Sequence, residues 1–256
     1  MFNMIRGDLY RLEHSKGFYI TETVLVVLVL TSILTGTLGS VGTHPQDLQN
    51  FQQANLVWTA GRATKLMTSM VSFLIYLILP LFIMTTGFEF SRLSYKNLLS
   101  SGMTRTNYFF SKYAVFLVIV CLQFILYYVT VFLGSGLKNG FGELTAKFGL
   151  KLAQTISLQL LLMLAIFAVS ILILFWTFST ITAVVATILF PIVVSVIRVI
   201  FSKVDWLKYF DFQNTIDSAF FTHFSSHTMA LSILTAGGTI LIFGLLALSV
   251  FKQKNL

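Results

Sequence analysis

Charged residues are scarce in this chain. Asp, Glu, Lys and Arg together make up 10% of its 256 residues, against roughly 25% in soluble domains. Hydrophobic residues account for 56%, and the mean hydropathy is +0.86. So few charges cannot cover the surface of a water-soluble globule of this length. The composition therefore excludes an ordinary soluble domain and predicts that lipid surrounds much of the chain.

Cysteine and proline are also rare. The single cysteine, Cys121, excludes an internal disulfide framework and any multi-cysteine metal site. It lies in an apolar stretch, where a free thiol usually serves as a small apolar side chain. The three prolines leave room for long uninterrupted helices. Pro80 and Pro191 fall inside predicted membrane spans, where each can kink its helix, and a hinge role for either stays open.

Motifs for nucleotide binding and hydrolytic catalysis are missing. The glycine-rich GSGLKNG at 134–140 lacks the Gly-Lys-Ser/Thr ending of a phosphate-binding loop, and neither GxSxG nor HExxH occurs. His223 and His227 could share one helical face, but no third ligand stands at a defined offset, and His14 and His44 are isolated. We therefore predict no catalytic residue, no metal site and no cofactor in this chain, so that any ATP and Mg²⁺ would be bound by a partner.

Ionisable residues are few within the predicted spans. Paired acids are absent there, which argues against a proton-relay pump, and no internal repeat is visible, which disfavours an inverted-repeat carrier. Glu22 in the first span and Arg198 near the end of the fifth are candidate functional charges. Both lie close enough to an interface for the side chain to reach it, so we favour a structural role for each.

Long apolar runs make up most of the chain. About 20 apolar residues are needed for a helix to cross the hydrocarbon core. The run 152–197 contains no charge and as one helix would be about 69 Å long, so it must fold back, and we expect the turn at 175–182. Because backbone groups in lipid must be paired within the segment, the runs must be helices. The sequence predicts an all-α polytopic membrane protein with six transmembrane helices at about 18–41, 66–88, 113–134, 152–175, 181–200 and 228–251.

The basic residues favour one orientation. The net charge is +8 and the sequence pI is about 9.6, but the bases lie mostly between apolar runs and are interpreted as topology signals, not as a nucleic-acid surface. With six spans both termini lie on one side, and slightly more Lys and Arg fall in the segments of that side. We therefore predict cytoplasmic termini. The first run reaches spanning length, so it is interpreted as an uncleaved helix and not as a signal peptide.

Two segments outside the spans have a helical pattern. Residues 2–16 place Phe2, Ile5, Leu9 and Leu12 on one face, which predicts an amphipathic helix lying in the interface. Residues 202–227 mix aromatic and charged residues. We expect a short helix there at the outer membrane surface, anchored by side chains that recur every four residues: Phe212, Ile216, Phe220 and Phe224.

The basic loop 89–112 lies between the second and third spans, and its middle can form a short helix ending at Gly102. The whole layout resembles the membrane subunit of the ABC transporter type-2 permease family, whose longest cytoplasmic loop lies at this place. The residue-level match is confined to this loop, and the family's frequent proline in the turn is replaced by Gly102-Met103. The matching residues follow in the family's order: Glu89, Lys96, Leu98, Leu99, Ser100, Gly102, Thr104, Arg105 and Lys112.

The resemblance implies a set of partners. A second permease subunit, identical or paralogous, would complete the pathway, and two copies of an ATP-binding subunit would dock on the 91–104 helix, which would carry their closure to the spans without catalysis by this chain. Small Phe- and Ile-rich permeases of this type are similar to bacterial cell-membrane exporters of antimicrobial or toxin peptides, including lantibiotic-immunity and phenol-soluble-modulin exporters. By that analogy the substrate is an amphipathic peptide. The coupling residues implied are Glu89, Leu93, Lys96, Leu98, Leu99 and Arg105.

Two other classes of protein fit the same composition. One is a channel or secondary carrier that works without ATP, and the other is a membrane scaffold or sensor module. Co-purification with an ATPase would separate the permease from both. Under the permease interpretation, changing Leu98 and Leu99 to Asp should abolish that association.

Overall fold

The computed structural model consists of helices joined by turns. It describes residues 2–37, 57–142, 145–201, 203–222 and 226–254, and this part of the chain contains no strand. An N-terminal helix, α1 (Phe2–Glu13), precedes the bundle. These features confirm the predicted all-α fold with six helices able to cross a membrane. Within the described residues the six are Lys16–Thr35, Ala60–Ser91, Arg105–Asn139, Ala146–Thr177, Thr180–Ile200 and His227–Gln253.

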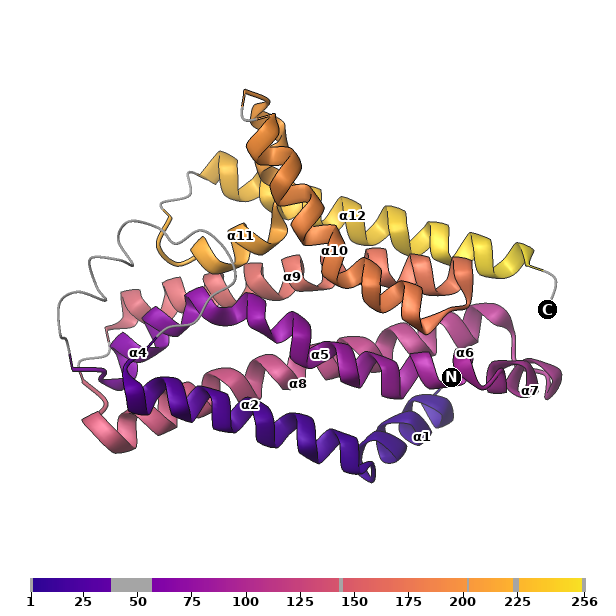
Figure 1. The fold of residues 1–256 in the computed structure, drawn as a ribbon, viewed down its shortest axis with the longest axis horizontal. Coiled ribbons are helices and arrows are strands. Elements are labelled where there is room, and N and C mark those ends of the chain that lie inside the picture. The colour runs from indigo at the N-terminus through magenta and orange to yellow at the C-terminus, as the bar shows by residue number, and fades with distance from the viewer. Residues whose placement is uncertain (1, 38–56, 143–144, 202, 223–225, 255–256) are drawn as a thin grey trace.

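Both ends of the described chain lie at the same end of the bundle, called here the termini end (Figure 1). Helix α1, the short helices α6 (Phe88–Ser91) and α7 (Ser94–Ser100), and the turn between α9 (Ala146–Thr177) and α10 (Thr180–Ile200) also lie there. The opposite end holds the end of α2 (Lys16–Thr35), the end of α8 (Arg105–Asn139) and the start of α9. Distant parts of the sequence therefore meet at the termini end.

The second span is a series of short helical segments, although its sequence predicts one helix. It runs through α4 (Ala60–Met67), the 3₁₀ segment η1 (Thr68–Phe73), α5 (Leu74–Phe82), the π-helical turn η2 (Ile83–Gly87) and α6. Pro80 lies inside α5, where it removes one backbone donor, and the π-helical turn follows three residues later. Irregular backbone at this depth is tolerated where protein side chains satisfy it.

Buried side chains from other helices satisfy carbonyls where α4 passes into the 3₁₀ segment. The Tyr127 hydroxyl of α8 donates to the Met67 carbonyl at 2.6 Å. The Gln159 amide of α9 donates to the Thr68 carbonyl at 2.9 Å and to the Ile216 carbonyl at 2.8 Å. These bonds fix the break in place and tie it to the segment before the last span.

Several transmembrane helices extend beyond the charge-free runs that predicted them, whereas α2 ends at Thr35, before the predicted limit. Helix α8 begins at Arg105 and α9 at Ala146, and the last helix, α12, covers Ser226–Gln253. Lysine and arginine near helix ends can reach the interface while the backbone stays helical, so a charge does not end a span. The predicted turn between the fourth and fifth spans lies at Phe178, which has a left-handed backbone (φ 53°).

Burial differs sharply among the helices. The stretch of α9 from Leu158 to Phe175 is mostly buried, whereas α2, α10 and α12 each bury a narrow face. On α2 the buried residues recur every four positions: Thr21, Leu25, Val29 and Ile33. The broad apolar faces that remain are suited to lipid or to another membrane subunit.

The segment before α12 differs from its sequence-based expectation. It contains η3 (Asp205–Tyr209) and α11 (Phe212–Ser218), and α11 packs against η1 and α9. Phe212, Ile216 and Phe220 are 2%, 0% and 4% exposed. The expected anchoring of these three side chains in the membrane surface is therefore wrong, because they pack inside the protein instead. Phe224, His223 and His44 lie outside the described residues.

Candidate functional site

The predicted coupling segment folds at the termini end as α6, a sharp turn and α7. Leu93 adopts a left-handed backbone (φ 56°) that reverses the chain between the two helices. Helix α7 ends at Ser100, and Gly102, at φ 96°, turns the chain toward α8. The short helix is therefore where the sequence predicted it, and glycine at 102 suits the positive φ.

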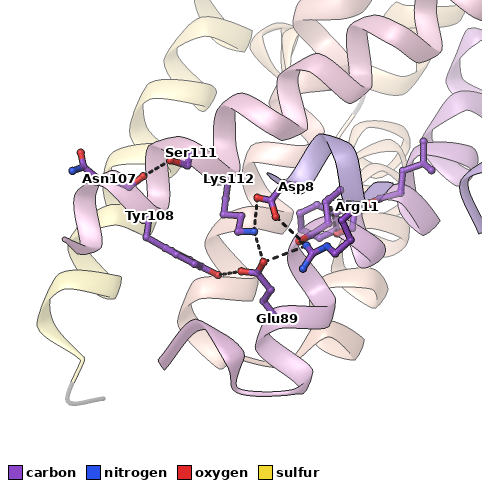
Figure 2. Close-up of polar contacts among 10 residues, drawn as sticks. Asp8, Arg11, Glu89, Asn107, Tyr108, Ser111 and Lys112 are labelled. Carbon is purple, nitrogen blue, oxygen red and sulfur yellow. Dashed lines mark hydrogen bonds and ion pairs between the residues drawn. The ribbon is translucent and has the colours of Figure 1, made fainter. Parts of the chain in front are cut away.

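A cluster of charged side chains, buried apart from the half-exposed Arg11, fixes α6 to α8 and α1 (Figure 2). Lys112 of α8 is 2% exposed, and its Nζ lies 2.6 Å from Asp8 Oδ2 and 2.5 Å from Glu89 Oε1. Arg11 lies 3.1 Å from Asp8 and 3.2 Å from Glu89. The Tyr108 hydroxyl donates to the other oxygen of Glu89 at 2.8 Å. These five residues are called the charge cluster below.

The charge cluster is electrically balanced. Two carboxylates, Asp8 and Glu89, face two cations, Arg11 and Lys112. Burial raises the pKa of the Asp8 carboxyl, while Lys112 beside it acts in the opposite direction. Charges out of water are tolerated when every partner is present, and the loss of one partner leaves a buried charge uncompensated. The cluster therefore makes the relative position of three helices depend on its buried charges, Asp8, Glu89 and Lys112.

Aromatic rings support α7 from beneath. Tyr95 is 2% exposed and stacks on Phe90 at 5.0 Å between ring centroids and on Phe178 at 5.4 Å. Phe90 and Phe178 also stack on each other at 5.3 Å. Phe251 at the end of α12 contacts Phe178 and Phe175. The three stacked rings, called here the aromatic stack, join α7 to the α9–α10 turn and to the last span.

The two faces of α7 differ. Tyr95 is buried, and Leu98 and Leu99 are partly buried against the main hydrophobic core. Leu93 is 52% exposed, and Lys96 is also exposed. Of the coupling residues implied by the resemblance, Leu93 and Lys96 are therefore presented outward, whereas the two leucines contribute to packing within the chain.

Arg105 is occupied within the chain. Its guanidinium donates to the backbone carbonyls of Phe251, Lys252 and Lys254 at 3.1, 2.7 and 2.7 Å. A cation at the C-terminal end of a helix pairs the free carbonyls and complements the helix dipole. Arg105 therefore fixes the end of α12 against the start of α8, and its predicted contact with an ATPase stays a prediction.

The two candidate intramembrane charges lie apart from this site and from each other. Arg198 pairs with Asp211 at 2.7 Å, and Asp211 also caps α11. Glu22 accepts a hydrogen bond from Gln123 of α8. Both side chains therefore have partners within the protein. The sequence instead predicted that they reach toward the membrane interface.

Sequence reasoning missed most members of the charge cluster and the aromatic stack. The amphipathic pattern of residues 2–16 does not single out Asp8, although this acid lies three residues after Ile5 and four before Leu12, on the same face. An acid within an apolar stripe was the available signal. Nothing local marks Tyr95 or Tyr108, because their partners come from distant segments.

No group of His, Cys, Asp and Glu side chains suited to a metal ion occurs in the part of the chain that the structure describes. His227 begins the last span there, whereas its predicted neighbour His223 is outside that part. Among known proteins, no family model matches the sequence, and no curated protein matches it either.

Proposed function

We propose that this chain is the membrane-spanning subunit of an ATP-driven exporter of the ABC type-2 permease kind, which works in a bacterial cell membrane with both termini in the cytoplasm. A separate ATP-binding subunit, in two copies, hydrolyses ATP, and a second permease subunit completes the pathway. Six membrane-spanning helices fit such a permease. The observation that carries the proposal is the position of α7, a short helix held at the termini end with an exposed face.

The contacts of α7 support a mechanical role. A force applied to the outer face of α7 would act through Tyr95, whose ring stacks on Phe178 in the α9–α10 turn. Phe90, the partner of Tyr95 in the stack, follows Glu89 of the charge cluster, so the same force reaches α1 and α8. A rigid, buried connection of this kind transmits displacement because packed interiors compress little.

The proposed substrate class is an amphipathic peptide. A cavity of about 380 Å³ lies between α2 and the broken second span. Its walls are apolar apart from a few hydroxyl groups, which suits the apolar face of such a peptide. The lining includes Leu28, Val29, Ser32, Met70, Phe73 and Tyr127.

Co-purification tests the proposal. The chain is co-expressed with candidate ATP-binding cassette proteins from its own genome, solubilised, and captured through a tag on the permease. We expect the ATPase to be retained by wild type and lost when Lys96→Glu is combined with Leu93→Asp, because both side chains are exposed on α7. These positions test the outer face directly, whereas Asp at the partly buried Leu98 and Leu99 would also disturb the core.

Lys252→Glu is the matched control, since it reverses an exposed charge at the same end of the molecule. It should leave the association intact. Normal ATPase binding by the Lys96→Glu, Leu93→Asp variant would overturn the assignment of α7. Absence of any association with wild type would favour a channel, carrier or scaffold that works without ATP.

A further inference from the structure

Two buried oxygen atoms in the bundle lack a hydrogen-bond partner, and they belong to neighbouring side chains. Gln123 of α8 is 1% exposed, and its Nε2 donates to Glu22 Oε1 of α2. The remaining oxygens, Glu22 Oε2 and Gln123 Oε1, are the two buried side-chain atoms without a partner in the described part of the chain. An unpaired polar atom out of water costs about 1–3 kcal/mol, so a pair of them requires an explanation.

Glu22 has no counter-ion. None of the described residues forms an ion pair with it. The helices that pack on α2 are α8, α5 and α1. Segment α5 has no charged residue, and Asp8 and Arg11 of α1 bind within the charge cluster with Lys112 of α8. An ionised carboxylate here would therefore be without a compensating charge.

We propose that Glu22 and Gln123 form a proton-binding site between α2 and α8. The proton resides on Glu22 Oε2 and is donated to Gln123 Oε1, while Gln123 Nε2 donates to Glu22 Oε1. A carboxylic acid and a primary amide that meet edge to edge close a ring of two hydrogen bonds in this way. One proton thus provides a partner for both unpaired oxygens and makes the site neutral.

A metal ion fits the same place less well. Hard cations such as Mg²⁺ and Ca²⁺ take six or more oxygen ligands, and this site offers two oxygens that are not already bonded. A proton needs one donor oxygen and one acceptor. The donor set therefore selects the proton.

Occupancy of the site controls how firmly α2 is held. Helix α2 also packs closely on α8 at Gly134, where an added Cβ would meet Leu30 at 2.9 Å, and Lys138 donates to the carbonyls of Ile33 and Leu34. These contacts lie toward the opposite end of the bundle. Loss of the proton sets a carboxylate against the Gln123 carbonyl oxygen and loosens the half of α2 nearer the termini end.

Infrared spectroscopy of the full chain in lipid nanodiscs tests the site. The carbonyl band of a protonated carboxylic acid is distinct from the bands of a carboxylate. At neutral pH we expect wild type to show an acid band that Glu22→Gln removes. Glu22→Gln should keep the melting temperature of wild type at this pH, because the glutamine amide reproduces both hydrogen bonds of the protonated pair. Glu13→Gln, which neutralises an exposed acid on α1, should leave the band unchanged.

Gln123→Leu gives an independent readout, since it removes the acceptor without touching the acid. The band should move to higher frequency, as for an acid without a hydrogen-bond partner. Raising the pH should lower the melting temperature of wild type relative to Glu22→Gln, because a carboxylate would then face the Gln123 carbonyl oxygen without a compensating charge. The proposal is overturned if wild type lacks a band sensitive to Glu22→Gln, if Gln123→Leu leaves that band in place, or if added sodium abolishes it at constant pH. None of these outcomes depends on the proposed transport function.

Discussion

Asp217 of α11 accepts two hydrogen bonds from a single residue of the broken second span, Ser72. The backbone N–H of Ser72 donates at 3.0 Å and its hydroxyl at 2.6 Å. The two residues are 145 positions apart. Ser72 lies in the 3₁₀ segment at 68–73, which departs from the α-helical hydrogen-bond pattern. The Asp217 carboxylate, from a distant part of the chain, accepts the hydrogen bond of the Ser72 N–H.

Asp217 should make stability depend on pH. Burial raises the pKa of this carboxyl, which lies outside the spans, from 3.8 to about 7. The folded protein therefore binds the proton more tightly than the unfolded chain, and this contribution to stability is lost as the pH rises from 3.8 through about 7. Asp217→Asn should abolish that loss, as measured by melting temperature across this range.

Asp205→Asn is the control for this measurement. Asp205 is exposed in η3, so its removal should leave the pH profile of wild type unchanged. Parallel profiles for wild type and Asp217→Asn would contradict the prediction.

Lys112→Met should be strongly destabilising. It leaves Asp8 and Glu89 buried without the cation that both contact, and removal of one member of a buried ion pair costs about 3–5 kcal/mol. Lys147→Met removes an exposed lysine and should cost little. Chemical unfolding in detergent measures both, and equal midpoints for the two variants would show that the charge cluster contributes little.

Tyr95→Ala should release α7 from the bundle. The change removes two ring-stacking contacts and opens a cavity beneath the helix. Hydrogen exchange followed by mass spectrometry should show faster exchange in 92–104 with little change in α8. Tyr10→Ala, at an exposed position on α1, is the control. Unchanged exchange in 92–104 would mean that the aromatic stack does not hold α7.

Gly87→Ala should force the end of η2 and the start of α10 apart. An added Cβ would lie 2.6 Å from Thr180 Cγ2, and Thr180 is itself held by its hydrogen bond to the Gly87 carbonyl at 2.9 Å. Overpacking of this kind costs typically about 1–3 kcal/mol. Gly149→Ala, where a Cβ meets nothing within 4 Å, should be neutral or stabilising because alanine favours the helix. Thermal unfolding compares the two, and a wild-type melting temperature for Gly87→Ala would refute the close contact.

Much of the fold follows from composition. The charge-free runs predicted six spans because a backbone in lipid must pair its own hydrogen bonds. The turn near Phe178 was predictable because the run 152–197 is too long for one crossing. Bounds were less accurate, since Arg105 and Lys138 continue a helix that hydropathy ends earlier.

The candidate site was predictable only in outline. The short helix after the second span and Gly102 at its end could be inferred from local pattern. The partners of Glu89 could not, because Arg11 comes from α1 and Lys112 and Tyr108 come from α8. The hydrogen bonds of Arg105 could not be predicted either, since the carbonyls that it binds lie 146 to 149 residues away in the sequence.

The sequence by itself determined that lipid surrounds much of this protein, because hydropathy is a sum over residues and does not depend on which residues are in contact. Tertiary structure alone decided which polar side chains meet: Asp217 with Ser72, Lys112 with Asp8 and Glu89, Glu22 with Gln123. The physical reason is that a buried polar group must find a partner wherever the packing of apolar helices brings one, and that packing is a property of the whole bundle.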